Sequence, residues 1–158
     1  MKILLATDGS KYSNGALEEV SKKVFLPNSE VRIISVYRES TQILEMDPMG
    51  TLRQYYAEME QNASKIAKSI AEDAVKTLHY KNPQLAVSII VIGGSAKDLI
   101  LEEANLFGAD LIVVGSHGYG PIKSFLLGSV SHAIALHAKC SVEIVRIDKL
   151  NNPKSNYV

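Results

Sequence analysis

Residues 109–131 read ADLIVVGSHGYGPIKSFLLGSVS, an apolar run followed by a segment that carries four of the ten glycines of the chain. A short continuous apolar run predicts a strand that is covered on both faces, as in a parallel sheet. Glycine lets the following backbone adopt positive φ and approach a ligand closely, and inward N–H groups form an anion nest. A helix that begins at Gly128-Ser129 would add free N–H groups that attract a phosphate. The glycines alone leave two interpretations open, a phosphate cradle or an ordinary loop with turn and cap glycines.

Further apolar runs predict other strands, and amphipathic segments between them predict helices. The expected strands cover residues 3–7, 31–36, 85–92, 110–114 and 142–147, and the expected helices cover about 11–24, 51–80, 95–107 and 129–138. Strands that alternate with helices predict a mainly parallel sheet with right-handed crossovers. We therefore expect an α/β fold with one domain over residues 1–148 and a polar tail over 149–158.

Residue spacing and capping residues predict the faces and ends of the helices. The first helix is expected to bury Ala16, Leu17, Val20 and Val24. The long helix carries apolar residues at the same spacing: Leu52, Tyr56, Met59, Ala63, Ile66, Ile70, Ala74 and Leu78. Ser10 and Ser95 are the expected N-caps of the first and third helices, and Gly108 is expected at the C-terminal end of the third.

Composition excludes several classes of protein. Lys plus Arg equals Asp plus Glu at 17 each, so no overall field favours nucleic acid or an acidic membrane surface. No apolar run reaches the ~20 residues that a membrane helix needs. The single cysteine, Cys140, excludes an internal disulfide framework and fits a reducing compartment. We expect a soluble cytoplasmic protein without nucleic-acid or membrane partners.

Small polar residues follow three of the expected strands. They form the segments Thr7-Asp8-Gly9-Ser10, Gly93-Gly94-Ser95 and Gly115-Ser116-His117-Gly118. Ligands of open α/β sheets bind beyond the carboxyl ends of strands, where the strand order reverses. A flavodoxin-like order reverses between strands one and three, and a Rossmann-like order 3-2-1-4-5 reverses between one and four. The glycines and serines after strand four favour the second order. The segment is neither a Walker A loop nor a GxGxxG fingerprint.

The spacing of these glycines resembles a known motif. Gly115-x-x-Gly118, nine residues, and then Gly128-Ser129 is similar to the G-2x-G-9x-G-(S/T) motif of the ATP-binding universal stress proteins. The stretches ILLATDGSKYSNGAL (3–17), VIGGSAKDLILEEANLFGADLIVVGSHGYG (91–120) and LLGSVSHAI (126–134) also resemble that family. The resemblance implies a Rossmann-like three-layer sandwich, with a five-stranded parallel sheet in the order 3-2-1-4-5. It also implies a homodimer joined along the strand from Val142 to Ile147, and a site for ATP or another adenine nucleotide (ADP, AMP).

The resemblance assigns the phosphate side of that site. Gly118, Gly128, Ser129 and Val130 would offer N–H groups to the phosphates. Ser129 and Ser131 would add hydroxyl groups. Mg²⁺ or Mn²⁺ would be held mainly by phosphate and water oxygens.

The resemblance also assigns the nucleoside side. Gly115 would lie near the ribose, and Ala6 and Thr7 would line the adenine pocket. Val36 would contact the adenine edge through its backbone. Asp8 would face the nucleoside or a bound cation, unless it serves only to cap the first helix with Ser10.

Two residues depart from the family pattern, and two carry other expectations. Ser141 stands where many members have proline, and Lys123 is the only cation of the nine-residue spacer. His117 lies within the loop, where it can contact phosphate. Glu143 in the last strand is expected at the rim of the dimer contact.

Three functions are weighed for such a chain. The first is a nucleotide-dependent dimeric sensor or switch in a stress response, which acts on an unidentified protein partner. The second is a slow ATP hydrolase of the adenine-nucleotide α-hydrolase superfamily. The third is a dimerising module that binds no nucleotide. The chain has no Walker lysine and no Ser-Gly-Gly-x-Asp-Ser loop after strand one, so no residue is assigned a catalytic role.

Overall fold

The computed structural model describes residues 1–39, 53–118 and 127–147 of the chain. The expected tail (149–158), the spacer residues 119–126 and the expected helix residues 51 and 52 lie outside these ranges. The described strands are β1 (Lys2–Ala6), β2 (Glu30–Tyr37), β3 (Ala86–Gly93), β4 (Leu111–Gly115) and β5 (Ser141–Val145). The described helices are α1 (Lys11–Lys22), α3 (Arg53–Lys81), α4 (Ala96–Phe107) and α5 (Ser129–His137).

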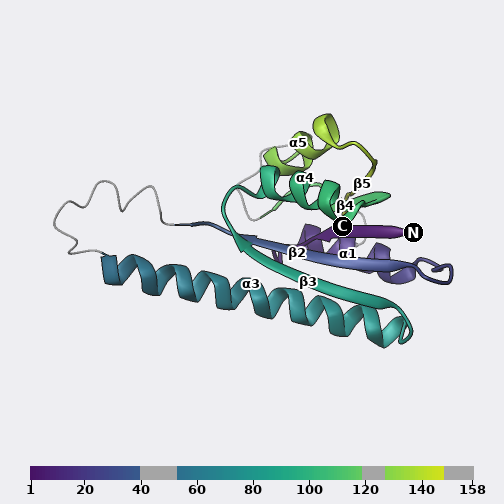
Figure 1. Ribbon diagram of the computed structural model, residues 1–158, viewed down its shortest axis with the longest axis horizontal. Helices are drawn as coiled ribbons and strands as arrows, with labels where there is room; N and C mark the ends of the chain where they lie inside the picture. Colours follow the sequence, from purple (N-terminus) through teal and green to yellow (C-terminus); the bar gives the residue numbers. More distant parts are fainter. Residues whose placement is uncertain (40–52, 119–126, 148–158) are drawn as a thin grey trace, which may run out of the picture.

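The five strands form one parallel sheet in the order β3-β2-β1-β4-β5. Figure 1 shows α3 along one side of this sheet and α4 and α5 on the other. The order reverses between β1 and β4, which confirms the expected Rossmann-like fold. The carboxyl ends of these two strands therefore border the crevice in which such sheets bind ligands.

Two apolar clusters hold the layers together, because alternate residues of a strand point to opposite faces. Leu5, Ile33 and Val113 point toward α1 and α3, and all three are fully buried. Leu4 and Ile112 point to the other face, where they pack with residues of α4 and α5. Both faces of β1 are thus covered, which explains its continuous apolar sequence.

The last turns of α4 are anchored at the amino ends of the strands, away from the crevice. Arg32 of β2 donates from its guanidinium to Glu103 Oε1 at 2.6 Å, and the same group lies 4.1 Å from the ring centroid of Phe107. Gly108 ends α4 with φ +65°, the left-handed conformation that favours glycine. The predicted C-terminal role of Gly108 is confirmed, and α4 has a fixed position relative to the sheet.

The first helix is shorter than predicted, and the prediction that Val24 is buried is wrong. Ser10 caps the helix as expected, because its Oγ accepts a hydrogen bond from the Ser13 N–H. The helix ends at Lys22, and Lys23 has extended backbone whose N–H donates to the Val20 carbonyl. Val24 is therefore no longer in phase with the buried face, and its side chain is 96% exposed.

The buried face of the long helix also differs from the prediction. Ile66 is 63% exposed and Met59 is 48% exposed, although both were expected on the buried face. The helix buries Ala74 and Leu78, as predicted, but it buries Ala67 and Ala71 in place of the larger residues. The small alanine side chains let α3 lie close to the sheet, and Figure 1 shows its N-terminal end reaching past the strands. The large apolar residues of that end consequently have no sheet beneath them.

Ser95 occupies the N-cap position of α4, but its side chain makes no capping hydrogen bond. The predicted position of Ser95 at the start of α4 is thus confirmed, but the predicted hydrogen bond from its side chain is wrong. Among the described residues, no helix has both the length and the apolar character needed to span a membrane.

Candidate functional site

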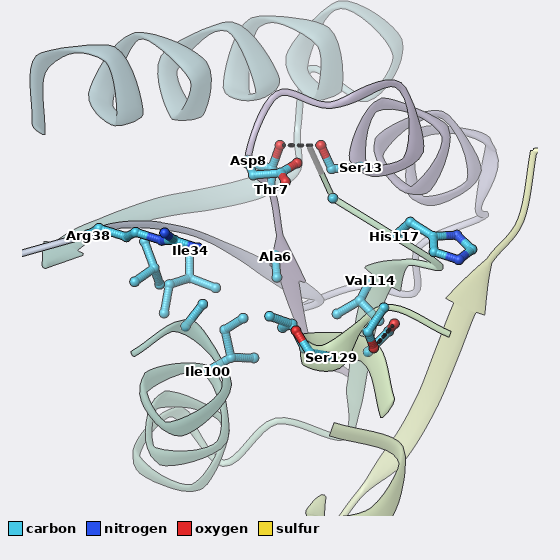
Figure 2. A pocket seen from close by; sticks show the side chains of 17 residues that line it. Ala6, Thr7, Asp8, Ser13, Ile34, Arg38, Ile100, Val114, His117 and Ser129 are labelled. Carbon is cyan, nitrogen blue, oxygen red and sulfur yellow. Dashed lines mark hydrogen bonds between the residues drawn. The ribbon is translucent and has the colours of Figure 1, made fainter. Parts of the chain in front are cut away.

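A cavity of about 500 Å³ opens at the carboxyl ends of β1, β2 and β4. Figure 2 shows side chains that converge on it from these strands, from α4 and from the start of α5. The sequence-predicted residues that line it are Ala6, Thr7, Asp8, Val36, Gly115, His117, Gly118, Gly128, Ser129, Val130 and Ser131. The fold therefore brings together every residue predicted for the nucleotide site, although their contacts with a ligand remain predictions.

The end of β1 forms a tight turn into α1. The Ser10 N–H donates to Asp8 Oδ1 at 3.0 Å, and the Gly9 N–H donates to Thr7 Oγ1 at 3.3 Å. The other Asp8 oxygen, Oδ2, faces Gly118, where a Cβ atom would lie 2.6 Å from it. Asp8 thus supports the start of α1 and also lines the cavity, so its two proposed roles are compatible.

The start of α5 forms the opposite wall. Gly128 is the N-cap residue, and no side chain caps the helix. The first helical hydrogen bond runs from the His132 N–H to the Gly128 carbonyl. The N–H groups of Ser129, Val130 and Ser131 precede that bond, as the first N–H groups of any helix do, and they suit an anion.

The loop before α5 is tied to the end of β4. The Gly128 N–H donates to the Ser116 carbonyl at 2.9 Å. The Ser131 hydroxyl lies 2.9 Å from the same carbonyl and 3.0 Å from the Gly128 carbonyl. These bonds hold the helix start against the strand end, although residues 119–126 between them are not described.

Gly115 has a structural role that sequence reasoning missed. A Cβ atom there would lie 2.6 Å from the Tyr12 carbonyl carbon and 2.8 Å from the Ser13 nitrogen, both in the backbone of α1. Its glycine is therefore required by the close approach of α1 to β4, whether or not a ribose lies nearby.

The rest of the cavity is largely apolar and was not predicted. The additional lining residues are Ser13, Ile34, Arg38, Ala96, Ile100 and Val114. Ile34 and Arg38 lie two residues from Val36 in either direction, so strand alternation was the available signal for them. Ala96 and Ile100 belong to the first turns of α4, directly after the Gly93-Gly94-Ser95 segment. The cavity thus has two parts. One is a polar wall of N–H and hydroxyl groups at the start of α5, and the other is an apolar slot lined by Ile34, Val36, Ile100 and Val114.

His117 follows the end of β4 and packs beside Tyr12 of α1. Its Nδ1 is 3.0 Å from Ser116 Oγ, and its ring centroid is 5.0 Å from that of Tyr12. These contacts hold the ring against Ser116 and α1, and its contact with a phosphate remains a prediction.

Asp8 is the only carboxylate among the described lining residues. Within the described part of the chain, no three His, Cys, Asp or Glu residues cluster as metal ligands. One carboxylate suits a divalent cation that takes most of its oxygen ligands from phosphates and water.

Two other residues of interest lie outside the cavity. Cys140 packs against the α4 and α5 cluster, and burial, followed by the charge of Asp110, raises the pKa of its thiol. Glu143, expected at a dimer rim, pairs with Lys23 of the same chain at 2.7 Å. This pair joins β5 to the end of α1.

Sequence comparison finds matches along the chain. A profile of the Universal stress protein family matches residues 1–146. Universal stress protein YxiE of Bacillus subtilis is 32% identical over 148 residues, which span 92% of this chain and 98% of that protein. Universal stress protein A homolog 2 of Coxiella burnetii is 48% identical over 81 residues, which span 49% of this chain and 55% of that protein.

Solved structures have the same fold. The hypothetical protein MJ0577 superposes with a TM-score of 0.80 at 28% identity, covering 94% of this chain and 96% of that one. An Arabidopsis thaliana family protein with AMP bound has a TM-score of 0.66 at 18% identity, covering 98% of this chain and 96% of that one. A universal stress protein in complex with cAMP has a TM-score of 0.64 at 21% identity, covering 94% of this chain and 98% of that one.

Proposed function

Because this chain belongs to the universal stress protein family, we propose that it binds an adenine nucleotide in the cavity between β1 and β4. We take ATP as the first ligand to test, and a dimeric nucleotide-dependent switch in a stress response as the biological role. One observation carries the proposal: all the residues that the family motif implicates line a single cavity with a polar wall and an apolar slot.

The polar wall suits the phosphates. The N–H groups of Gly118, Ser129 and Val130 and the dipole of α5 favour an anion. The Gly128 N–H, predicted to bind phosphate as well, donates to the Ser116 carbonyl instead. Of the described lining residues, Asp8 is the only acid, so a divalent cation between it and the phosphates would relieve their repulsion.

The apolar slot suits the nucleoside. Val36 and Ala6 border it, with Ile34, Ile100 and Val114 beside them. A planar base in this slot buries apolar surface, and the polar groups at its edge fix its orientation. The AMP and cAMP complexes of the relatives named above support the choice of adenine nucleotides as a class.

The switch follows from where the ligand would lie. A bound nucleotide adds negative charge at the carboxyl edge of the sheet, and a protein partner can distinguish the two states there. β5 is the edge strand of the described sheet, next to β4, so we place the second copy along its outer side. The Ser116 N–H donates to the Val145 carbonyl, and strand alternation therefore turns the backbone groups of Val142 and Ile144 toward that free edge.

The test compares two serines at helix starts. The purified protein is denatured to identify any released nucleotide, and the stripped protein is titrated with ATP, ADP and AMP by calorimetry. We expect Ser129→Ala to weaken ATP binding by about ten- to hundredfold, since a hydrogen bond to a charged group contributes ~1.5–3 kcal/mol. Ser95→Ala is the matched control, because Ser95 begins α4, lies outside the cavity and makes no capping bond.

Each outcome has a clear meaning. If no adenine nucleotide binds at millimolar concentration, the proposal fails. Equal effects of the two substitutions would show that the start of α5 does not hold the phosphates. Sustained phosphate release would instead favour the slow hydrolase. Sedimentation equilibrium tests the dimer, and a monomer at all concentrations would refute the β5 contact.

A further inference from the structure

Arg38 lines the cavity but has no role in the function proposed above. It follows Tyr37, the last residue of β2, and its side chain is exposed. Residues two apart in extended chain lie on the same face, so Arg38 continues the line of Ile34 and Val36. Its side chain therefore borders the apolar slot rather than the polar wall at the start of α5.

Figure 2 shows where the guanidinium lies. Its nitrogen atoms are beside Ile34, on the side of the cavity opposite His117 and Ser129. Ile100 of α4 lies on the same side as Arg38 in this view. A phosphate held at the start of α5 would thus be at the other end of the cavity from Arg38.

The charges of the cavity leave this guanidinium available to a ligand. Asp8 is the acid among the described lining residues, and it accepts its hydrogen bond from the Ser10 N–H. Across the described ranges, no ion pair involves Arg38. A guanidinium is planar and weakly hydrated, so it stacks on aromatic faces better than an ammonium does.

We propose that Arg38 covers the nucleobase, with its guanidinium stacked on the ring face that the apolar slot leaves open, and so favours purines over smaller pyrimidines. This inference rests on the proposed nucleotide binding. Ile34, Val36 and Ile100 supply the apolar wall for the base, and Arg38 closes the slot at its rim. Arg38 is then a specificity-determining residue of the base, separate from the phosphate contacts.

The test uses ligands that share a base and differ in charge. Adenosine, AMP and ATP are titrated by calorimetry into the wild type, Arg38→Met and Arg38→Lys, at low and high salt. Methionine keeps a long apolar side chain without the charge, and lysine keeps the positive charge without the planar guanidinium group. A cation–π contact corresponds to a loss of about twofold in affinity when exposed and about thirtyfold when desolvated. We expect a similar loss for all three ligands in Arg38→Met, a smaller loss in Arg38→Lys, and a smaller loss for CMP than for AMP.

The matched control is Arg53→Met, which makes the same chemical change at an exposed position on α3 outside the cavity. It should bind like the wild type. A loss that grows from adenosine to ATP and shrinks with salt would make Arg38 a phosphate ligand and overturn the inference. Unchanged affinity in Arg38→Met would overturn it as well, while the proposed function would stand. A wild type that binds none of the ligands would instead refute the proposed function, and the inference with it.

Discussion

Gly115 offers a sharp test of how α1 meets the sheet. In Gly115→Ala, the new methyl group would lie 2.6 Å from the Tyr12 carbonyl carbon and 2.7 Å from its oxygen. Both atoms belong to the backbone, so α1 or the end of β4 must move. Overpacking of this kind costs about 1–3 kcal/mol, and we expect a loss near the middle, about 2 kcal/mol, in the free energy of unfolding. For a domain of this length, that loss lowers the melting temperature by about 4–8 °C.

The assay is equilibrium unfolding in urea, followed by circular dichroism, without nucleotide. Gly118→Ala is the matched control. Among the described residues, its methyl group would meet only the end of the Asp8 side chain, with Oδ2 at 2.6 Å, and that side chain can rotate away. We expect it to change the unfolding free energy by less than about 1 kcal/mol. Equal losses in the two variants, or no loss in Gly115→Ala, would refute the claimed backbone approach.

Three further predictions concern the rest of the fold. Leu78→Ala should lose about 2–5 kcal/mol of unfolding free energy, because Leu78 is fully buried, whereas Ile66→Gln should stay within about 0.5 kcal/mol of the wild type. Urea unfolding compares the two variants, and a larger loss in Ile66→Gln than in Leu78→Ala would contradict the observed buried face of α3. Glu103→Ala should cost about 1–3 kcal/mol by leaving the partly buried Arg32 without its carboxylate, and a thermal melt with no shift would show the pair to be dispensable. Cys140 should react with a thiol reagent near pH 8 more slowly in the folded than in the urea-unfolded protein, because burial raises the pKa of its thiol and the thiolate is the nucleophile; equal rates would contradict its packing.

The strand order was predictable because the glycines that follow β4 indicate a ligand crevice between β1 and β4. Continuous apolar runs identified the strands, and the glycines and serines after β4 indicated a reversal beside β1. The phase of α3 was not predictable in the same way. Ile66 and Ala67 are neighbours in sequence, and hydrophobicity alone favours burying the larger residue. Close packing against the sheet buries the smaller one, which is a tertiary effect.

The two sides of the cavity were predictable to different degrees. Gly118 and Ser129 stand out, because glycine and serine at a strand end and a helix start are chemically distinctive. Ile34 and Ile100 do not, because an apolar residue that lines a pocket has the same sequence pattern as one that fills a core. Arg38 was missed for another reason: it follows the strand in a polar segment whose position the sequence leaves undefined.

The hydrogen bonds of Ser131 limit what that residue can do for a ligand. A hydroxyl group has one proton, and both oxygens within reach of the Ser131 hydroxyl are carbonyls of its own loop. Ser131 can therefore donate to a phosphate only by releasing the loop, whereas the exposed Ser129 has no such commitment among the described residues. Ser131 thus holds the start of α5 against the end of β4, and in the proposed complex Ser129 would be the hydroxyl donor. A threonine at position 131 would keep this contact, and an alanine would loosen the cavity before it removed any ligand contact.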